Sequence, residues 1–129
     1  MFKKLLQKIS TREKGKQAED IAESFLLSKG YSILCRNFRC KLGEIDIIAR
    51  KGKTLIFVEV KSNFSREDFV PEEKVDKKKK EKIFKTAEVY LLKNSKILSK
   101  IKEIRMDVIV VKVPEVEVKH YEGAFFREE

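Results

Sequence analysis

The sequence is poor in the residues on which several common functional sites depend. It has two cysteines, Cys35 and Cys40, and one histidine distant from them, so neither a zinc site nor a disulfide framework is supported. Five glycines in 129 residues form no glycine-rich loop, which excludes the fingerprints of nucleotide-triphosphate binding. Long apolar spans and internal repeats are also lacking. The chemistry of this chain must therefore rest on carboxylates and lysines.

The first ten residues, MFKKLLQKIS, interrupt a short apolar stretch with lysines. No small-residue cleavage site follows, so the segment does not have the pattern of a secretion signal and we expect a cytoplasmic protein. We divide the chain into a basic N-terminal extension, residues 1–10, and a single domain, residues 11–129.

Positive charge is in excess, with a formal net charge of +9. Such a balance favours a polyanionic partner, and the lack of a long apolar span favours nucleic acid over membrane. Residues 74–85 hold seven lysines against two acids, although such a run is also typical of a solvated helix face. The loop before this run carries Phe64 and Phe69, which either contact substrate or fold back on the core. The candidate nucleic-acid contacts are Lys74, Lys77, Lys78, Arg36 and Arg66.

Hydrophobic periodicity predicts an α/β order of elements. In chain order these are a helix at residues 11–29, strands at 31–38, 45–49 and 54–60, a helix at 76–94, a strand at 104–113 and a stretch from residue 116 that can form an edge strand.

Residues 43–62, GEIDIIARKGKTLIFVEVKS, place charges where a purely structural hairpin would avoid them. The run LIFVEV is apolar on both sides of its alternation, which predicts a central strand covered on both faces. Glu59 lies within it. Because an unpaired buried carboxylate costs several kcal/mol, Glu59 needs a cation, a hydrogen-bond donor or access to solvent.

The turn between these two strands decides which acids meet. We predict an even turn with Arg50 opposite Lys53. The pairs that follow are Ala49–Thr54, Asp46–Phe57 and Glu44–Glu59, and the face they share carries Glu44, Asp46, Glu59 and Lys61. Asp46 then lies diagonal to Glu59, roughly 7 Å away between backbones, so that both carboxylates can hold one hard cation.

Two carboxylates beside a lysine suit the hydrolysis of phosphodiesters. Mg²⁺, or Mn²⁺ in its place, is held by one or two carboxylates plus water in such sites. Lys61 would either orient the attacking water or stabilise the pentavalent charge.

These residues resemble the PD-(D/E)xK nuclease superfamily, because Asp46 and the triplet Glu59-Val60-Lys61 fit its signature. More closely, the chain is similar to the YraN-like bacterial family, itself similar to archaeal Holliday junction resolvases. Ile45 departs from the superfamily's proline, and the loop after Lys61 lacks a glycine and an arginine associated with the family. The match covers nearly the whole chain and is carried by Gly15, Ala18-Glu19, Gly30-Tyr31, Arg36-Asn37, residues 43–46 and 57–61, Lys74-Val75, Lys78, Arg105 and Asp107-Val108.

The resemblance implies a restriction-endonuclease-like fold: three layers, with a central mixed sheet of about four or five strands flanked by helices, in the order αβββαβ plus an edge strand. It implies that Asp46 and Glu59 are the main metal ligands, that Glu19 is a third ligand reaching from the first helix, and that Lys61 is the catalytic lysine. Glu44 would contact these residues rather than bind the metal directly.

Three titratable residues also have ordinary structural explanations. Glu19 lies in the early turns of its helix, where the helix dipole favours an anion. Asp107 is expected to form an ion pair with Arg105 or with its basic surroundings, and His120 to be a hydrogen-bonded structural residue rather than a ligand.

The resemblance implies a Mg²⁺- or Mn²⁺-dependent endonuclease acting on DNA, with branched or junction DNA as a substrate in repair or recombination, and a homodimer. The alternative is a non-catalytic nucleic-acid-binding or repair-accessory protein on the same fold. A third hypothesis is a protein-interaction module whose lysines serve only solvation. Salt-sensitive DNA binding separates this third hypothesis from the other two.

Overall fold

The fold follows the predicted order of helices and strands. The structure, a computed structural model, describes residues 11–63, 76–113 and 115–127, apart from the side chains of residues 11, 12, 14 and 63. The elements are α2 (Thr11–Ser28), β1 (Ser32–Cys40), β2 (Gly43–Lys51), β3 (Thr54–Asn63), α4 (Lys77–Lys93), the 3₁₀ helix η1 (Ser95–Lys100), β4 (Glu103–Lys112) and β5 (Glu117–Phe125). The stretch between α4 and β4 is largely η1, and the stretch from residue 116 forms the expected edge strand.

The five strands form one mixed sheet in the order β1-β2-β3-β4-β5. Neighbouring strands are antiparallel except β3 and β4, which run parallel because the chain crosses over through α4 between them. β3 is the central strand, as its apolar pattern predicts, and β5 is an edge strand.

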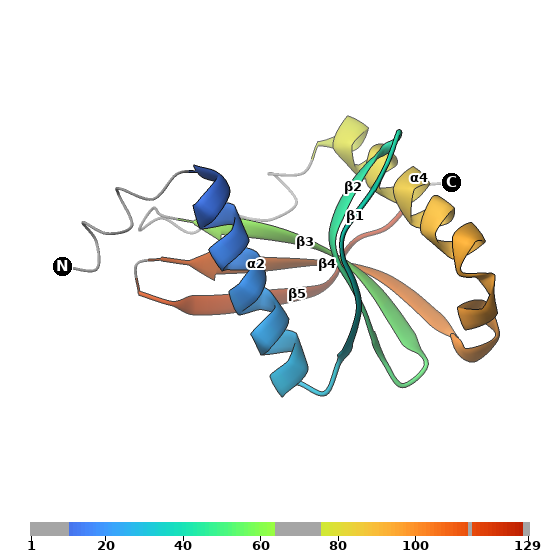
Figure 1. The fold of residues 1–129 in the computed structure, drawn as a ribbon, viewed down its shortest axis with the longest axis horizontal. Coiled ribbons are helices and arrows are strands. Elements are labelled where there is room, and N and C mark those ends of the chain that lie inside the picture. The colour runs from blue at the N-terminus through green and yellow to red at the C-terminus, as the bar shows by residue number, and fades with distance from the viewer. Residues whose placement is uncertain (1–10, 64–75, 114, 128–129) are drawn as a thin grey trace.

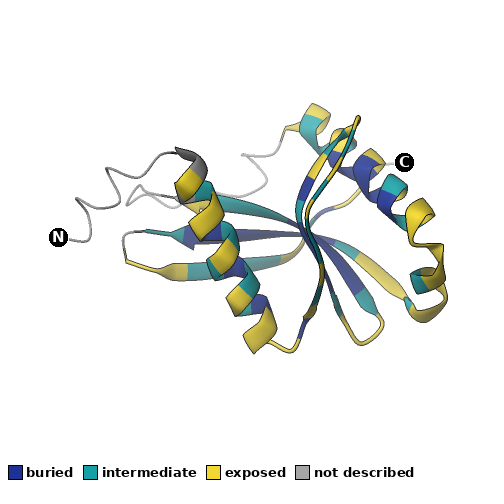
Figure 2. Cartoon of the chain, viewed as in Figure 1, coloured by how far each residue is buried: buried dark blue, intermediate teal, exposed yellow. Residues whose placement is uncertain are grey.

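The two helices cover opposite faces of the sheet, as Figure 1 shows. α2 packs Ala18, Ala22 and Leu26 against one face, and α4 packs Ile83, Phe84 and Tyr90 against the other. Alternate residues of β3 supply both cores, and β3 and β4 carry the longest buried stretches of the sheet (Figure 2). The result is the predicted restriction-endonuclease-like arrangement of three layers.

The register of the β2–β3 hairpin differs from the prediction by two residues. Lys51 pairs with Thr54, which leaves Gly52 and Lys53 as the turn, and Ile48 rather than Asp46 pairs with Phe57. The physical reason is Gly52, whose φ of 59° occupies the first turn position. Glycine adopts a positive φ there without strain, whereas the predicted turn would place Lys51 at that position. The turn is still even, so the predicted face is preserved.

No helix in the described ranges is long and apolar enough to cross a membrane. Cys35 and Cys40 are both free thiols, as their sequence context predicts.

Candidate active site

Asp46 lies where the main-chain pairing of β2 with β3 ends. The last pair is Ile47–Val58, and continuing this register puts Asp46 directly across from Glu59 rather than diagonal to it. The Val60 N–H donates a hydrogen bond of 2.8 Å to Asp46 Oδ2, so a side-chain carboxylate takes the place of a strand carbonyl. From here the β1–β2 hairpin turns away from β3 toward the start of α4 (Figure 1).

The environment of Asp46 disfavours its ionised form. Burial, and after it repulsion from Glu59, raises the pKa of Asp46 from 3.8 to about 7. The hydrogen bond from Val60 opposes this rise, whereas the charges of Glu19 and Glu44 add smaller contributions to it. A carboxyl group with such a pKa, opposite a second carboxylate, is typical of functional sites and of positions where a cation relieves repulsion.

Glu59 is held by two ammonium groups at once. Its Oε1 atom lies 3.2 Å from Lys61 Nζ and 3.0 Å from Lys79 Nζ, although Glu59 is only 11% exposed. Glu59, the buried strand carboxylate for which the sequence indicated no definite partner, is thus paired with a lysine of its own strand and with a lysine of α4.

The two lysines differ in their ionisation. Burial lowers the pKa of Lys61, and its hydrogen bond with Lys79 lowers it further, against the attraction of Glu59. The pKa of Lys79 is raised, because its hydrogen bond with Lys61 and the charges of Glu59 and Asp46 outweigh its burial.

These groups surround an open hollow of about 470 Å³ between the hairpin and the start of α4. The residues that line it are Gly43, Glu44, Asp46, Glu59, Asp76, Lys78, Lys79, Lys82 and Ile83. The two main predicted metal ligands therefore face one cavity whose opposite wall is basic. Such a wall attracts an anionic substrate toward the carboxylates.

Close packing holds the two walls of the hollow together. A Cβ added at Gly43 would lie 2.9 Å from Thr86 Oγ1, so only glycine lets β2 approach α4 this closely. Thr86 is fully buried, and its hydroxyl donates a 2.7 Å hydrogen bond to the Lys82 carbonyl. The sequence motif beginning at Gly43 therefore has a structural role in the spacing of the hollow.

Glu19 is the predicted ligand that the structure does not bring into this hollow. Its Oε1 atom lies 3.6 Å from Arg36 Nη2, and Arg36 also contacts Asp20 and Glu23 of α2. Arg36 thus ties β1 to α2, and its predicted phosphate contact remains a prediction. Within the described ranges, no group of three or more His, Cys, Asp or Glu side chains is close enough to form a metal site.

Glu44 and one of the predicted basic contacts, Lys78, line the hollow. Glu44 lines it and pairs with Arg39 at 3.2 Å. Lys78 lines it, and Lys77 is exposed in the same first turn of α4. Lys74, Arg66, Phe64 and Phe69 lie outside the described residues.

Sequence reasoning missed Lys79 and Lys82 as individual members of the site. The signal that could have found Lys79 is helical spacing, because it precedes the buried Ile83 by four positions and so lies on the sheet-facing side of α4. Lys82 precedes the buried Thr86 by the same interval.

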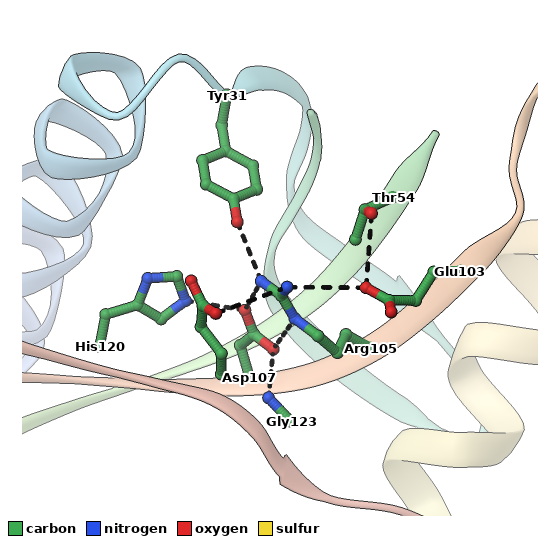
Figure 3. Close-up of polar contacts among 8 residues, drawn as sticks. Tyr31, Thr54, Glu103, Arg105, Asp107, His120 and Gly123 are labelled. Atoms are coloured by element: carbon green, nitrogen blue, oxygen red, sulfur yellow. Dashed lines mark hydrogen bonds and ion pairs between the residues drawn. The ribbon is translucent and has the colours of Figure 1, made fainter. Parts of the chain in front are cut away.

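A second polar cluster lies on the face of the sheet that α2 covers and is shown in Figure 3. The carboxylate of Asp107 is fully buried. It accepts hydrogen bonds from Arg105 Nη2 at 2.9 Å and from the Gly123 N–H at 2.9 Å, and His120 Nε2 lies 2.7 Å from its Oδ2 atom. Arg105 also donates to the Tyr31 hydroxyl at 2.9 Å. The expected ion pair of Asp107 and the hydrogen-bonded role of His120 are both confirmed, and the cluster joins the connection between α2 and β1 to β4 and β5.

The layered α/β fold, with an aspartate and a Glu-x-Lys triplet at the point where two strands separate, places this protein in the restriction-endonuclease-like class of domains. The chain belongs to the family described as "Uncharacterised protein family UPF0102", whose model matches residues 18–111. The resemblance read from the motifs is thereby confirmed at the level of the family.

Related bacterial proteins of this family align with most of the chain. A UPF0102 protein of Persephonella marina is 49% identical over 98 residues, covering 76% of this chain and 82% of its own length. A UPF0102 protein of Clostridioides difficile is 43% identical and covers 91% of this chain and 100% of its own length.

Among solved structures, that of Pyrococcus furiosus SfsA in complex with Ca²⁺ is similar at a TM-score of 0.38 and 19% identity, covering 88% of this chain and 64% of the SfsA chain. A likeness at this level carries no argument about fold or function.

Proposed function

We propose that this protein is a Mg²⁺- or Mn²⁺-dependent endonuclease that hydrolyses phosphodiester bonds of DNA, with branched or junction DNA as its first candidate substrate. The observation that carries this proposal is the placement of Asp46 and Glu59 on one wall of a hollow whose other wall bears Lys78, Lys79 and Lys82. Lys61 adjoins Glu59. Two carboxylates and a lysine therefore lie together at a position that attracts a phosphate group.

The donor set fits a hard divalent cation held largely by water. Asp46 and Glu59 supply carboxylate oxygens. Burial, and then repulsion from Glu59, raises the pKa of Asp46, and a cation between the two groups would relieve that repulsion. Mg²⁺ is bound by one or two carboxylates plus water more often than by a complete protein cage. Glu19 would complete the set only after leaving Arg36, so its role as third ligand remains a prediction.

The residues of the chain would divide the work of hydrolysis. The α4 lysines draw the DNA backbone into the hollow, while Asp46 and Glu59 hold the cation. When bound, such a cation supplies positive charge at the scissile phosphate and lowers the pKa of water. Lys61 orients the attacking water or stabilises charge on the pentavalent phosphorus. The water oxygen bonds to phosphorus, the bond to one sugar oxygen breaks, and that oxygen takes up a proton.

One observation favours a second candidate function, that of a non-catalytic DNA-binding protein. Glu59 is already engaged by two lysines, and the described residues hold no three-ligand cluster. In such a protein the acids and lysines would form a structural ion-pair network, while the exposed lysines of α4 would still bind phosphates.

A cleavage assay distinguishes the two candidates. Purified protein is incubated with four-way junction, single-stranded and duplex DNA in Mg²⁺ or Mn²⁺, beside Asp46→Asn and Glu59→Ala. Loss of cleavage in both variants supports the nuclease. Cleavage that survives both substitutions, or binding to DNA without cleavage of any substrate, refutes it, and the latter result supports the binding protein.

A further inference from the structure

Lys79 is a second lysine of the candidate active site, and it is closer to Glu59 than Lys61 is. The distances from Glu59 Oε1 are 3.0 Å to Lys79 Nζ and 3.2 Å to Lys61 Nζ. The superfamily signature accounts for Lys61 but not for Lys79. A role for Lys79 must therefore be argued from its position.

The backbone of Lys79 is fixed while its side chain reaches across the hollow. Asp76 caps α4, and its Oδ1 atom accepts the Lys79 N–H at 2.8 Å. Tight packing between Gly43 and Thr86 fixes the distance between α4 and β2. The Lys79 side chain itself is 43% exposed, so its ammonium group can change partner without moving the helix.

Charge balance indicates what that partner is. Without a cation, the carboxyl groups of Asp46 and Glu59 face the amino groups of Lys61 and Lys79. A divalent cation held by the two carboxylates would add two positive charges and take up the Glu59 oxygen that Lys79 contacts. The displaced ammonium group then needs another anion, and a DNA phosphate entering the same hollow supplies one.

An ordinary explanation is that Lys79 forms a partly exposed ion pair that contributes little beyond stability. Such pairs are worth about 0–1 kcal/mol. That explanation does not account for two ammonium groups on one carboxylate oxygen, nor for a basic wall that continues through Lys78 and Lys82.

We propose that Lys79 exchanges between two anions: it holds Glu59 when the site is without a cation, and it binds a substrate phosphate when Glu59 holds a cation. This inference rests on the proposed function for its catalytic consequence. The exchange itself couples cation binding to DNA binding. A cation on Glu59 frees Lys79 to bind a phosphate, and a phosphate on Lys79 leaves Glu59 free to bind a cation, so each ligand raises the affinity for the other.

The test measures cation binding and DNA cleavage in the same variants. Lys79→Met removes a competitor for Glu59, so calorimetry without DNA should show about threefold to fivefold tighter Ca²⁺ or Mn²⁺ binding. The same variant should cleave junction DNA about 100-fold more slowly, because a phosphate contact is lost. A merely structural lysine would instead weaken both properties together. Lys79→Arg, which keeps the charge, should retain most of the cleavage rate.

Two control variants make the comparison specific. Lys78→Met removes a charge from the same hollow without a contact to Glu59, so its effect on cation affinity should be smaller than that of Lys79→Met. Lys96→Met removes an exposed charge in η1 and should match the wild type in both assays.

The inference is overturned if Lys79→Met leaves cation affinity unchanged or weaker, or if it cleaves at the wild-type rate. If the wild type cleaves no DNA, the proposed nuclease fails, and Ca²⁺-dependent binding to junction DNA decides the role of Lys79. Threefold or greater weakening of that binding, together with tighter Ca²⁺ binding, supports the exchange. DNA binding equal to that of the wild type overturns it.

Discussion

Replacing Asp46 with asparagine should remove the site's largest internal repulsion while keeping its shape. The carboxylate is buried, faces Glu59 and accepts the Val60 N–H. An asparagine oxygen can accept the same hydrogen bond, and its amide can donate to Glu59. The substitution therefore tests the charge of residue 46 separately from its geometry.

The magnitude follows from the pKa of Asp46, which burial and Glu59 raise from 3.8 to about 7. Between these values the unfolded chain has already lost the proton that the folded protein keeps, so stability falls as pH rises from about 4 to about 7 and is level above. At about 1.4 kcal/mol per pKa unit, the ionised carboxylate costs up to about 4 kcal/mol. Water in the open hollow reduces this cost, and we expect about 1–3 kcal/mol.

The assay is urea unfolding in the presence of a chelator at pH 5 and pH 8. Asp46→Asn should be more stable than the wild type by about 1–3 kcal/mol at pH 8, and this difference should shrink to roughly a third at pH 5. The exposed Glu115→Gln should show no such pH dependence. If Asp46→Asn is equal to or less stable than the wild type at pH 8, the ionised carboxylate does not destabilise the folded protein and the reasoning fails.

Three further predictions concern packing, the buried cluster and charge. Gly43→Ala should lower the free energy of unfolding by about 1–3 kcal/mol, because its Cβ would lie 2.9 Å from Thr86 Oγ1; wild-type stability in urea would contradict this. Asp107→Asn should cost about 3 kcal/mol at pH 7, since it leaves Arg105 without its buried partner. The Arg105 and His120 contacts hold the pKa of Asp107 below 3.8 despite its burial, so their stabilisation is present above about pH 4 and is lost as the pH falls further. The stability difference should therefore narrow below about pH 4 in acid titrations followed by circular dichroism, and a constant difference would contradict this assignment. Lys78→Ala should weaken DNA binding and reduce its salt slope by about one, whereas an unchanged slope would exclude a phosphate contact.

The sequence predicted the elements well because their patterns are local. The apolar stripe of α4 and its capping residues Asp76 and Asn94 lie within one stretch of chain, and both ends are where they were expected. The central position of β3 was predictable because its run is apolar on both faces.

What the sequence could not predict depends on distances between elements. The register of the hairpin was wrong by two residues, because the tight turn begins one residue later, at Gly52. Contact between Lys79 and Glu59 depends on how α4 lies against β3, and no local pattern specifies that. The meeting of Tyr31 with Arg105 likewise joins positions 74 residues apart.

The central claim is that Asp46 and Glu59 form a cation-dependent nuclease site. The most direct test is the single-turnover rate of junction-DNA cleavage in Mg²⁺ by wild-type protein and Asp46→Asn purified in the same way. We predict that the wild type cleaves and that the variant is at least about 1,000-fold slower, although it is the more stable protein at pH 8. Equal rates, or no cleavage by the wild type in Mg²⁺ or Mn²⁺, would contradict the claim.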